Sequence, residues 1–204
     1  MITIINYGLG NIKAFANVYE KLEVPIKIAR HASDLKRATK VILPGVGAFD
    51  YAIQCLEKSG MRKILEEIVL YRKVPVLGVC VGMQMLARSS EEGKLPGFGW
   101  IDAVVKKFDT TSFSCAPCLP HMGWNDVKAV KVNGLFHEIG HVGQYYFLHS
   151  YIMHCRKKEN VIAVADYGGE FVCAVNSNNI YGVQFHPEKS HQWGIRLLYN
   201  FAKL

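Results

Sequence analysis

VPVLGVCVGMQ, residues 74–84, is the stretch that decides the fold. Its apolar first half predicts a buried strand, and its second half predicts a turn into a helix. Cys80 stands at the turn with a glycine two residues to either side. In the serine version of this pattern, the nucleophile sits exposed on a sharp strand-to-helix turn, and a helix N-terminus stabilises a thiolate. Cys80 is therefore a candidate nucleophile, and the alternative is a buried structural cysteine.

Strands and helices alternate on the N-terminal side of this stretch. The apolar runs predict strands at 1–6, 25–29, 41–43 and 74–79, separated by helical segments at 12–22, 49–58 and 61–72, with the helix after Cys80 running to about Arg88. This alternation is typical of an α/β protein with a mostly parallel, doubly wound sheet. Active sites in such sheets lie beyond the carboxyl ends of the strands, so the loops 6–11, 44–49 and 78–82 should share one edge.

The second half of the chain has a different pattern. Short apolar segments joined by turns predict strands at 101–107, 121–130, 145–153, 161–167, 171–176 and 180–185. These strands are expected to form a largely antiparallel C-terminal extension of the sheet, and a helix around 196–201 closes the chain. With neither a repeat nor a linker in view, we expect a single domain over residues 1–204.

Composition narrows the functional classes. Half of the 204 residues are hydrophobic and a fifth are charged, which is ordinary for a soluble globular protein. No apolar run reaches the length of a membrane span, and the first residues do not resemble a secretory signal, so we expect a cytoplasmic protein with its six cysteines as free thiols. The net charge of +7 is not gathered into a long basic stripe, so an acidic protein partner or a phosphorylated substrate is favoured over nucleic acid.

A thiolate nucleophile needs a base, and Gln184-Phe185-His186-Pro187-Glu188 offers one. Proline disfavours a helical conformation at His186, so the segment is predicted to be extended, with His186 and Glu188 on the same face. Glu188 would then orient the imidazole toward Cys80. The alternative is a strand end with a solvated histidine and glutamate.

Acyl chemistry also needs donors for a developing oxyanion. The glycine-rich turn after the third strand, Pro44-Gly45-Val46-Gly47, can present backbone N–H groups, and the N–H of Val81 follows the nucleophile directly. Taken alone, the glycine-rich turn could equally be an ordinary turn.

Three further motifs are weak. The H-E-x-x-H run at 137–141 resembles a zinc peptidase signature, but its glycines oppose the helix that this chemistry requires. The C-x-x-C pair at 115–118 lacks a second pair or a preceding βα unit, and Gly8-Leu9-Gly10 lacks the third glycine of a dinucleotide fingerprint. We therefore predict neither a metal nor a cofactor.

Together these residues resemble the class I (triad-type) glutamine amidotransferases, which have a flavodoxin-like sheet. The matching pieces are Asn6–Asn11, Leu43–Gly47, Gly78–Gln84, Pro120–Asn125, Tyr146–Tyr151 and Gln184–Ser190. The resemblance implies a glutaminase with Cys80 as nucleophile, His186 as base and Glu188 as the residue that orients it. It also implies oxyanion donors at Gly47 or Val46 and at Val81, and contacts to the α-amino and α-carboxylate groups of glutamine from Gln84, Glu92, His149, Ser150 and Tyr151.

The same resemblance implies a partner. The predicted closing helix leaves no room for an ammonia-accepting domain, so ammonia would pass to a HisF-like (β/α)₈ barrel synthase subunit that forms imidazole glycerol phosphate in histidine biosynthesis. Asn11, Trp124 and Lys189 match positions expected near that interface, and tryptophan is a favoured interface anchor. Two alternatives remain at this point: a similar glutaminase that serves amidino-sugar synthesis, and a redox-sensing protein with a cysteine at the same turn.

Overall fold

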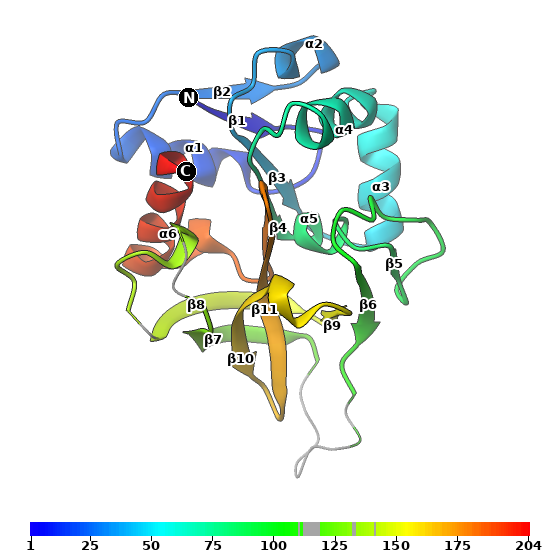
Figure 1. Cartoon of the computed structure of the whole chain (residues 1–204), viewed down its shortest axis with the longest axis vertical. Helices are drawn as coiled ribbons and strands as arrows, with labels where there is room; N and C mark the ends of the chain where they lie inside the picture. Colours follow the sequence, from blue (N-terminus) through cyan, green and yellow to red (C-terminus); the bar gives the residue numbers. More distant parts are fainter. Residues whose placement is uncertain (110, 112–118, 132–133, 141) are drawn as a thin grey trace.

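The computed structural model describes residues 1–109, 111, 119–131, 134–140 and 142–204. Five parallel strands form one side of its sheet, beginning at the edge, in the order β2 (Ile26–Ala29), β1 (Ile2–Ile5), β3 (Val41–Gly45), β4 (Val76–Cys80) and β12 (Ile180–Val183) (Figure 1). The first four follow the predicted strands. Their loops after β1, β3 and β4 meet at one edge, as expected.

Helices cover both faces of this parallel sheet (Figure 1). The helices α1 (Ile12–Lys21) and α6 (His191–Lys203) pack together on one face, while α3 (Phe49–Lys58), α4 (Arg62–Leu70) and α5 (Val81–Gln84) lie on the other. The short α2 (Ala32–Leu35) packs against α4. Each long helix buries one apolar stripe against the strands, which is why helical periodicity located them correctly. The predicted doubly wound α/β fold is confirmed.

The antiparallel extension continues the same sheet beyond β12. Its strands follow in the order β11 (Glu170–Ser177), β10 (Val161–Asp166), β7 (His121–Ala129) and β8 (Val142–His149). A branch adds β9 (Tyr151–Cys155), β6 (Ala103–Lys107) and the two-residue β5 (Ser89–Ser90). Three 3₁₀ turns complete the fold: η1 (Gly134–Phe136), η2 (Lys158–Asn160) and η3 (Pro187–Lys189). Strand β12 is antiparallel to β11 but parallel to β4, so it joins the two halves of the sheet.

Two of the differences from the predicted boundaries shape the candidate site. The expected strand at 145–153 is interrupted at Ser150, because β8 pairs with β7 while β9 turns away to pair with β6. The helix after Cys80 ends at Gln84 rather than near Arg88. The N–H groups of Leu86 and Ala87 donate only three residues back, to Met83 and Gln84, and the N–H of Arg88 donates to the carbonyl of Ala103 at the start of β6, so the α-helical pattern is not continued.

Four of the six cysteines lie among the described residues. Cys55, Cys80, Cys155 and Cys173 are free thiols, as expected, whereas the C-x-x-C pair at 115–118 lies outside the described residues. Every helix in the described part of the chain is too short or too polar to cross a bilayer.

Candidate active site

Cys80 sits at a strained backbone turn at the end of β4. Its φ of 56° and ψ of −116° lie outside the regions that non-glycine residues favour, and such strain is common at functional sites. Close packing holds the turn: a Cβ atom on Gly82 would overlap the carbonyl oxygen of Leu43 in β3, and a Cβ on Gly78 would press against the carbonyl of Gly82. The two flanking glycines are therefore required where β4 passes into α5.

Strand β12 carries the chain to His186 beside this turn. His186 Nδ1 is 2.9 Å from Glu188 Oε1, and both side chains are almost fully buried. Because a carboxylate only accepts, Nδ1 carries the proton and Nε2 is left to face Cys80. The prediction that these residues pair is confirmed. His186 itself is extended, as predicted, but the extended conformation predicted to continue to Glu188 is wrong, because residues 187–189 form the 3₁₀ turn η3 and Glu188 reaches back across it.

Electrostatics favour a charged imidazole at this position. Burial lowers the pKa of His186, but hydrogen bonds and charge interactions with Cys80 and Glu188 outweigh burial and raise the pKa from 6.5 to about 10. The other carboxylate oxygen of Glu188, Oε2, is buried without a hydrogen-bond partner among the residues described. His186 therefore holds a proton readily between the sulfur and the carboxylate.

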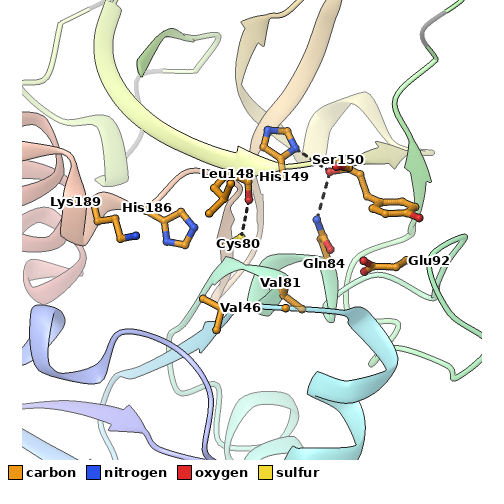
Figure 2. Close-up of a pocket in the computed structure, with 12 residues that line it drawn as sticks. Val46, Cys80, Val81, Gln84, Glu92, Leu148, His149, Ser150, His186 and Lys189 are labelled. Atoms are coloured by element: carbon orange, nitrogen blue, oxygen red, sulfur yellow. Dashed lines mark hydrogen bonds between the residues drawn. The ribbon is translucent and has the colours of Figure 1, made fainter. Parts of the chain in front are cut away.

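A cavity of about 140 Å³ opens over the sulfur of Cys80 (Figure 2). Figure 2 shows His186 and Gln84 on opposite sides of Cys80, with Glu92 beyond Gln84. The structure brings eleven of the predicted site residues to this one cavity: Val46, Gly47, Cys80, Val81, Gln84, Glu92, His149, Ser150, Tyr151, His186 and Lys189. The loop after β3, the end of β4, α5, β8, β9 and the segment after β12 thus converge, although they are far apart in the sequence.

The end of the cavity away from His186 is polar and firmly held. The Gln84 amide donates to the carbonyl oxygen of Tyr151 at 3.3 Å and to Gln184 Oε1 at 3.1 Å. Glu92 Oε2 accepts from the N–H of Phe49, the first residue of α3, at 2.9 Å. Glu92 is therefore fixed at the cavity wall, where its carboxylate can attract an ammonium group.

Sequence reasoning missed three residues at the site. Gln184 is fully buried and its amide nitrogen lies 3.8 Å from the Cys80 sulfur, while the carbonyl of Leu148 lies 3.8 Å from the same sulfur. The buried hydroxyl of Ser190 donates to the carbonyl of His186 and accepts from the N–H of Tyr146, which ties η3 to β8. Gln184 and Ser190 lie on either side of the H-P-E motif. The available signal in the sequence was therefore a polar residue close to each end of this motif.

Exposed apolar side chains adjoin the cavity. Met122 opposes Leu148, and Trp124 opposes Tyr146, in the β7–β8 ladder. We call Val46, Met122, Trp124 and Leu148 the rim surface, because all four are substantially exposed and Val46 and Leu148 also line the cavity.

The three residues predicted near a partner interface lie in different elements. Lys189 Nζ lies 5.4 Å from the centre of the Tyr146 ring, and Trp124 stacks on His191. Asn11 is exposed at the start of α1.

The described part of the H-E-x-x-H run at 137–141 is not helical. His137 follows η1 in a turn rather than in a helix, and His141 lies outside the described residues. Across the part of the chain that the structure describes, no group of three or more histidine, cysteine, aspartate or glutamate side chains could hold a metal ion.

Comparison with known proteins defines the class. The family model of the class-I glutamine amidotransferases matches residues 3–204, and the chain belongs to this family. It is therefore a glutamine-hydrolysing enzyme by family. Among curated relatives, a protein of Bdellovibrio bacteriovorus is 55% identical over the full length of both chains, and one of Leptospira interrogans is 51% identical over the full length of both. Each of these relatives is named imidazole glycerol phosphate synthase subunit HisH.

Solved structures share the fold at low sequence identity. A crystal structure described as a glutamine amidotransferase matches with a TM-score of 0.77 and 15% identity, covering all of both chains. The structure of PurLQS from Thermotoga maritima matches with a TM-score of 0.70 and 19% identity, covering 99% of this chain and 97% of the other. These likenesses support the α/β architecture alone.

Proposed function

We propose that this chain is one amidotransferase domain over residues 1–204. It would hydrolyse glutamine to glutamate and pass the ammonia to a (β/α)₈ barrel synthase of the HisF type. The product would be imidazole glycerol phosphate, made in histidine biosynthesis by a cytoplasmic heterodimer. The observation that carries the proposal is the convergence of Cys80 and His186 on one small cavity, with Glu188 hydrogen-bonded to His186 behind it, in a chain that is 55% identical to a HisH subunit.

The proposed chemistry proceeds through a thioester. The Cys80 sulfur gives its proton to His186 Nε2, and the resulting thiolate attacks the side-chain amide carbon of glutamine. His186 then gives that proton to the leaving nitrogen, so that ammonia departs and a glutamyl thioester remains. Water, deprotonated by His186, attacks the thioester, glutamate leaves, and the sulfur regains a proton from His186. Glu188 holds the imidazole in the required tautomer through Nδ1.

The surroundings of Cys80 support the remaining roles. The N–H groups of Val81 and of Val46 or Gly47 border the cavity and are proposed to hold the oxyanion. At the polar end, Glu92 and Gln84 are proposed to receive the α-amino group of glutamine. Backbone groups of residues 149–151, where the β8–β9 strand breaks, are proposed to receive its α-carboxylate.

The rim surface supports a partner that receives ammonia directly. Ammonia released into bulk water would be protonated and lost as a nucleophile, so the cavity needs a cover. Exposed Trp124 and Met122 on β7 offer apolar anchors beside the cavity, and Lys189 offers a positive charge. A barrel subunit that docks on this face would seal the cavity from solvent.

The decisive experiment measures glutamate release with and without a HisF-type barrel and its nucleotide substrate. We expect the barrel to stimulate release, and Cys80→Ala to abolish glutamine-dependent synthesis while leaving synthesis from added ammonium salts intact. A barrel from amidino-sugar synthesis serves as the matched control and should not stimulate. Stimulation by that barrel alone would overturn the histidine assignment, and absence of any Cys80-dependent glutaminase would overturn the proposal as a whole.

A further inference from the structure

Two buried histidines next to the cavity take no part in the proposed proton transfers. His121 on β7 and His149 on β8 are directly paired in the antiparallel ladder, and they are only 3% and 6% exposed. Both point away from the rim surface, since side chains alternate along a strand and Met122 and Leu148 are exposed. Two imidazoles in a core are unusual enough to require an explanation.

Aromatic rings enclose this pair. The His121 ring stacks on Tyr167 with centroids 4.0 Å apart and on Phe147 at 4.8 Å. The His149 ring lies 5.3 Å from Phe108, and Phe171 packs against both imidazoles. An apolar enclosure of this kind makes an unpaired ring nitrogen costly, so each nitrogen needs a partner.

All four ring nitrogens of His121 and His149 have a hydrogen-bond partner, and the direction of every hydrogen bond can be assigned. His149 Nδ1 lies 2.9 Å from the carbonyl oxygen of Tyr151, which can only accept, so Nδ1 is the donor. His149 Nε2 then accepts from His121 Nδ1 at 3.1 Å, and His121 Nε2 accepts from the Asn125 amide at 3.3 Å. The same Asn125 amide donates to the carbonyl of Asp166 at 2.7 Å. A single chain of N–H donors therefore runs from β7 to the Tyr151 carbonyl.

The environment keeps both rings neutral, as this chain requires. Burial lowers the pKa of His121 to about 4 and that of His149 to about 3, in the latter case with help from the neighbouring His121 and His186. Neutral imidazoles have one donor and one acceptor each, which is the requirement of a one-way chain.

The chain ends on the wall of the cavity. The Tyr151 carbonyl also accepts from the Gln84 amide, which donates in turn to Gln184, and the Gln184 amide contacts the Cys80 sulfur. The break between β8 and β9 at Ser150 is thus held from one side by the imidazole pair and from the other by Gln84. Without the pair, the broken strand would lose its inner support.

We propose that His121 is a positioning residue for glutamine: through His149 it holds the backbone of residues 149–151 in the geometry that receives the substrate's α-carboxylate. This inference rests on the proposed function, because it assigns a support to the proposed glutamine subsite. His121 touches neither the substrate nor the sulfur. Its role is to supply the N–H that fixes the tautomer and orientation of His149.

The test compares two reagents that alkylate Cys80 in the isolated chain. One is 6-diazo-5-oxo-L-norleucine, which carries the α-amino and α-carboxylate groups of glutamine, and the other is iodoacetamide, which carries neither. The variant His121→Phe keeps a ring in the aromatic enclosure but removes both nitrogens. His121→Asn restores an amide donor near the position of Nδ1. His154→Phe, at an exposed position of β9, is the control for the same change outside the chain of hydrogen bonds.

We expect His121→Phe to slow labelling by the amino-acid reagent about tenfold or more, the scale of one buried hydrogen-bonding group left unpaired, with iodoacetamide rates within about twofold of wild type. His121→Asn should recover most of the loss, and His154→Phe should resemble wild type. If His121→Phe does not fold, Asn125→Leu, at the outer and part-exposed end of the chain, should show the same selective loss at smaller size. If each variant changed the labelling rate by the same factor for both reagents, the inference would be overturned.

Failure of the underlying proposal would look different. Wild-type Cys80 that resists the amino-acid reagent both alone and with the HisF-type barrel, but reacts with iodoacetamide, would remove the glutamine subsite itself, and the proposed function with it. Wild-type labelling followed by an unselective or absent effect of His121→Phe would remove only the positioning role.

Discussion

At the scale of single residues, Glu188 is the clearest test of the proposed triad. Its Oε1 holds His186 at 2.9 Å and its side chain is buried, so water cannot substitute for it. Glu188→Gln keeps the shape but removes the negative charge that stabilises an imidazolium. We expect kcat for glutamine hydrolysis to fall by about 100-fold or more, with little change in KM. Steady-state glutamate release in the barrel complex measures this, and Glu20→Gln on the exposed face of α1 should be silent.

His186 also predicts a pH dependence of stability. Its pKa in the folded protein, about 10, lies above the ordinary 6.5, so the folded state binds the proton more tightly than the unfolded state. The stabilisation is therefore fully present below pH 6.5 and is lost as the pH rises toward 10. The thermal midpoint of wild type should decline across this window relative to His186→Gln, which lacks the titrating group. A constant difference between the two proteins would contradict the ion pairing of His186.

At the scale of elements, the β4–α5 turn depends on the absence of side chains. A Cβ on Gly82 would overlap the Leu43 carbonyl of β3, and backbone cannot move aside as a flexible side chain can. We expect Gly82→Ala to lower the free energy of unfolding by about 1–3 kcal/mol, as overpacking does. It should also slow iodoacetamide labelling of Cys80, because the turn shifts.

Gly60→Ala is the control for backbone strain alone. Gly60 has a φ of +70° and nothing within 4 Å of its Cβ position, so this change should cost only about 1 kcal/mol. Urea unfolding of both variants makes the comparison. A loss at Gly82 no greater than that at Gly60 would show that β3 does not constrain the turn.

The sequence predicted which segments are helices and which are strands, but it predicted less well where each of them ends. Periodicity found α1, α3, α4 and β4, because each buries a continuous apolar stripe. The end of α5 at Gln84 was not predictable, since the N–H of Arg88, which would continue the helix, donates instead to the carbonyl of Ala103 in β6. The break at Ser150 was hidden for a similar reason: the apolar pattern runs through it, and only the divergent pairing of β8 and β9 separates the strands.

At the scale of the whole molecule, the rim surface should decide association. Trp124 is 46% exposed and stacks on His191, so it is presented in a fixed orientation beside the cavity. We expect Trp124→Ala to weaken binding of a HisF-type barrel by about tenfold or more, the scale of an interface anchor. Alkylation of Cys80 by iodoacetamide in the isolated chain should stay unchanged. Titration calorimetry measures the affinity.

Tyr71→Ala provides the matched loss of an exposed aromatic. Tyr71 is 81% exposed and follows α4, near the start of β4 and therefore at the sheet edge opposite Cys80. Its removal should leave the affinity for the barrel unaltered. Equal effects of the two changes would argue that the rim surface is not the docking face.

The sequence by itself determined the order of strands and helices, the nucleophile turn and the H-P-E pair, because local apolar periodicity and glycine spacing are written in neighbouring residues. Only the tertiary structure decided that η3, rather than an extended strand, brings Glu188 onto His186. It alone showed that Gln184 and the carbonyl of Leu148 surround the Cys80 sulfur, and that His121 and His149 form a buried donor chain. The physical reason is that these contacts join strands far apart in the chain, and their partners are chosen by sheet register and by the need to satisfy every buried polar atom.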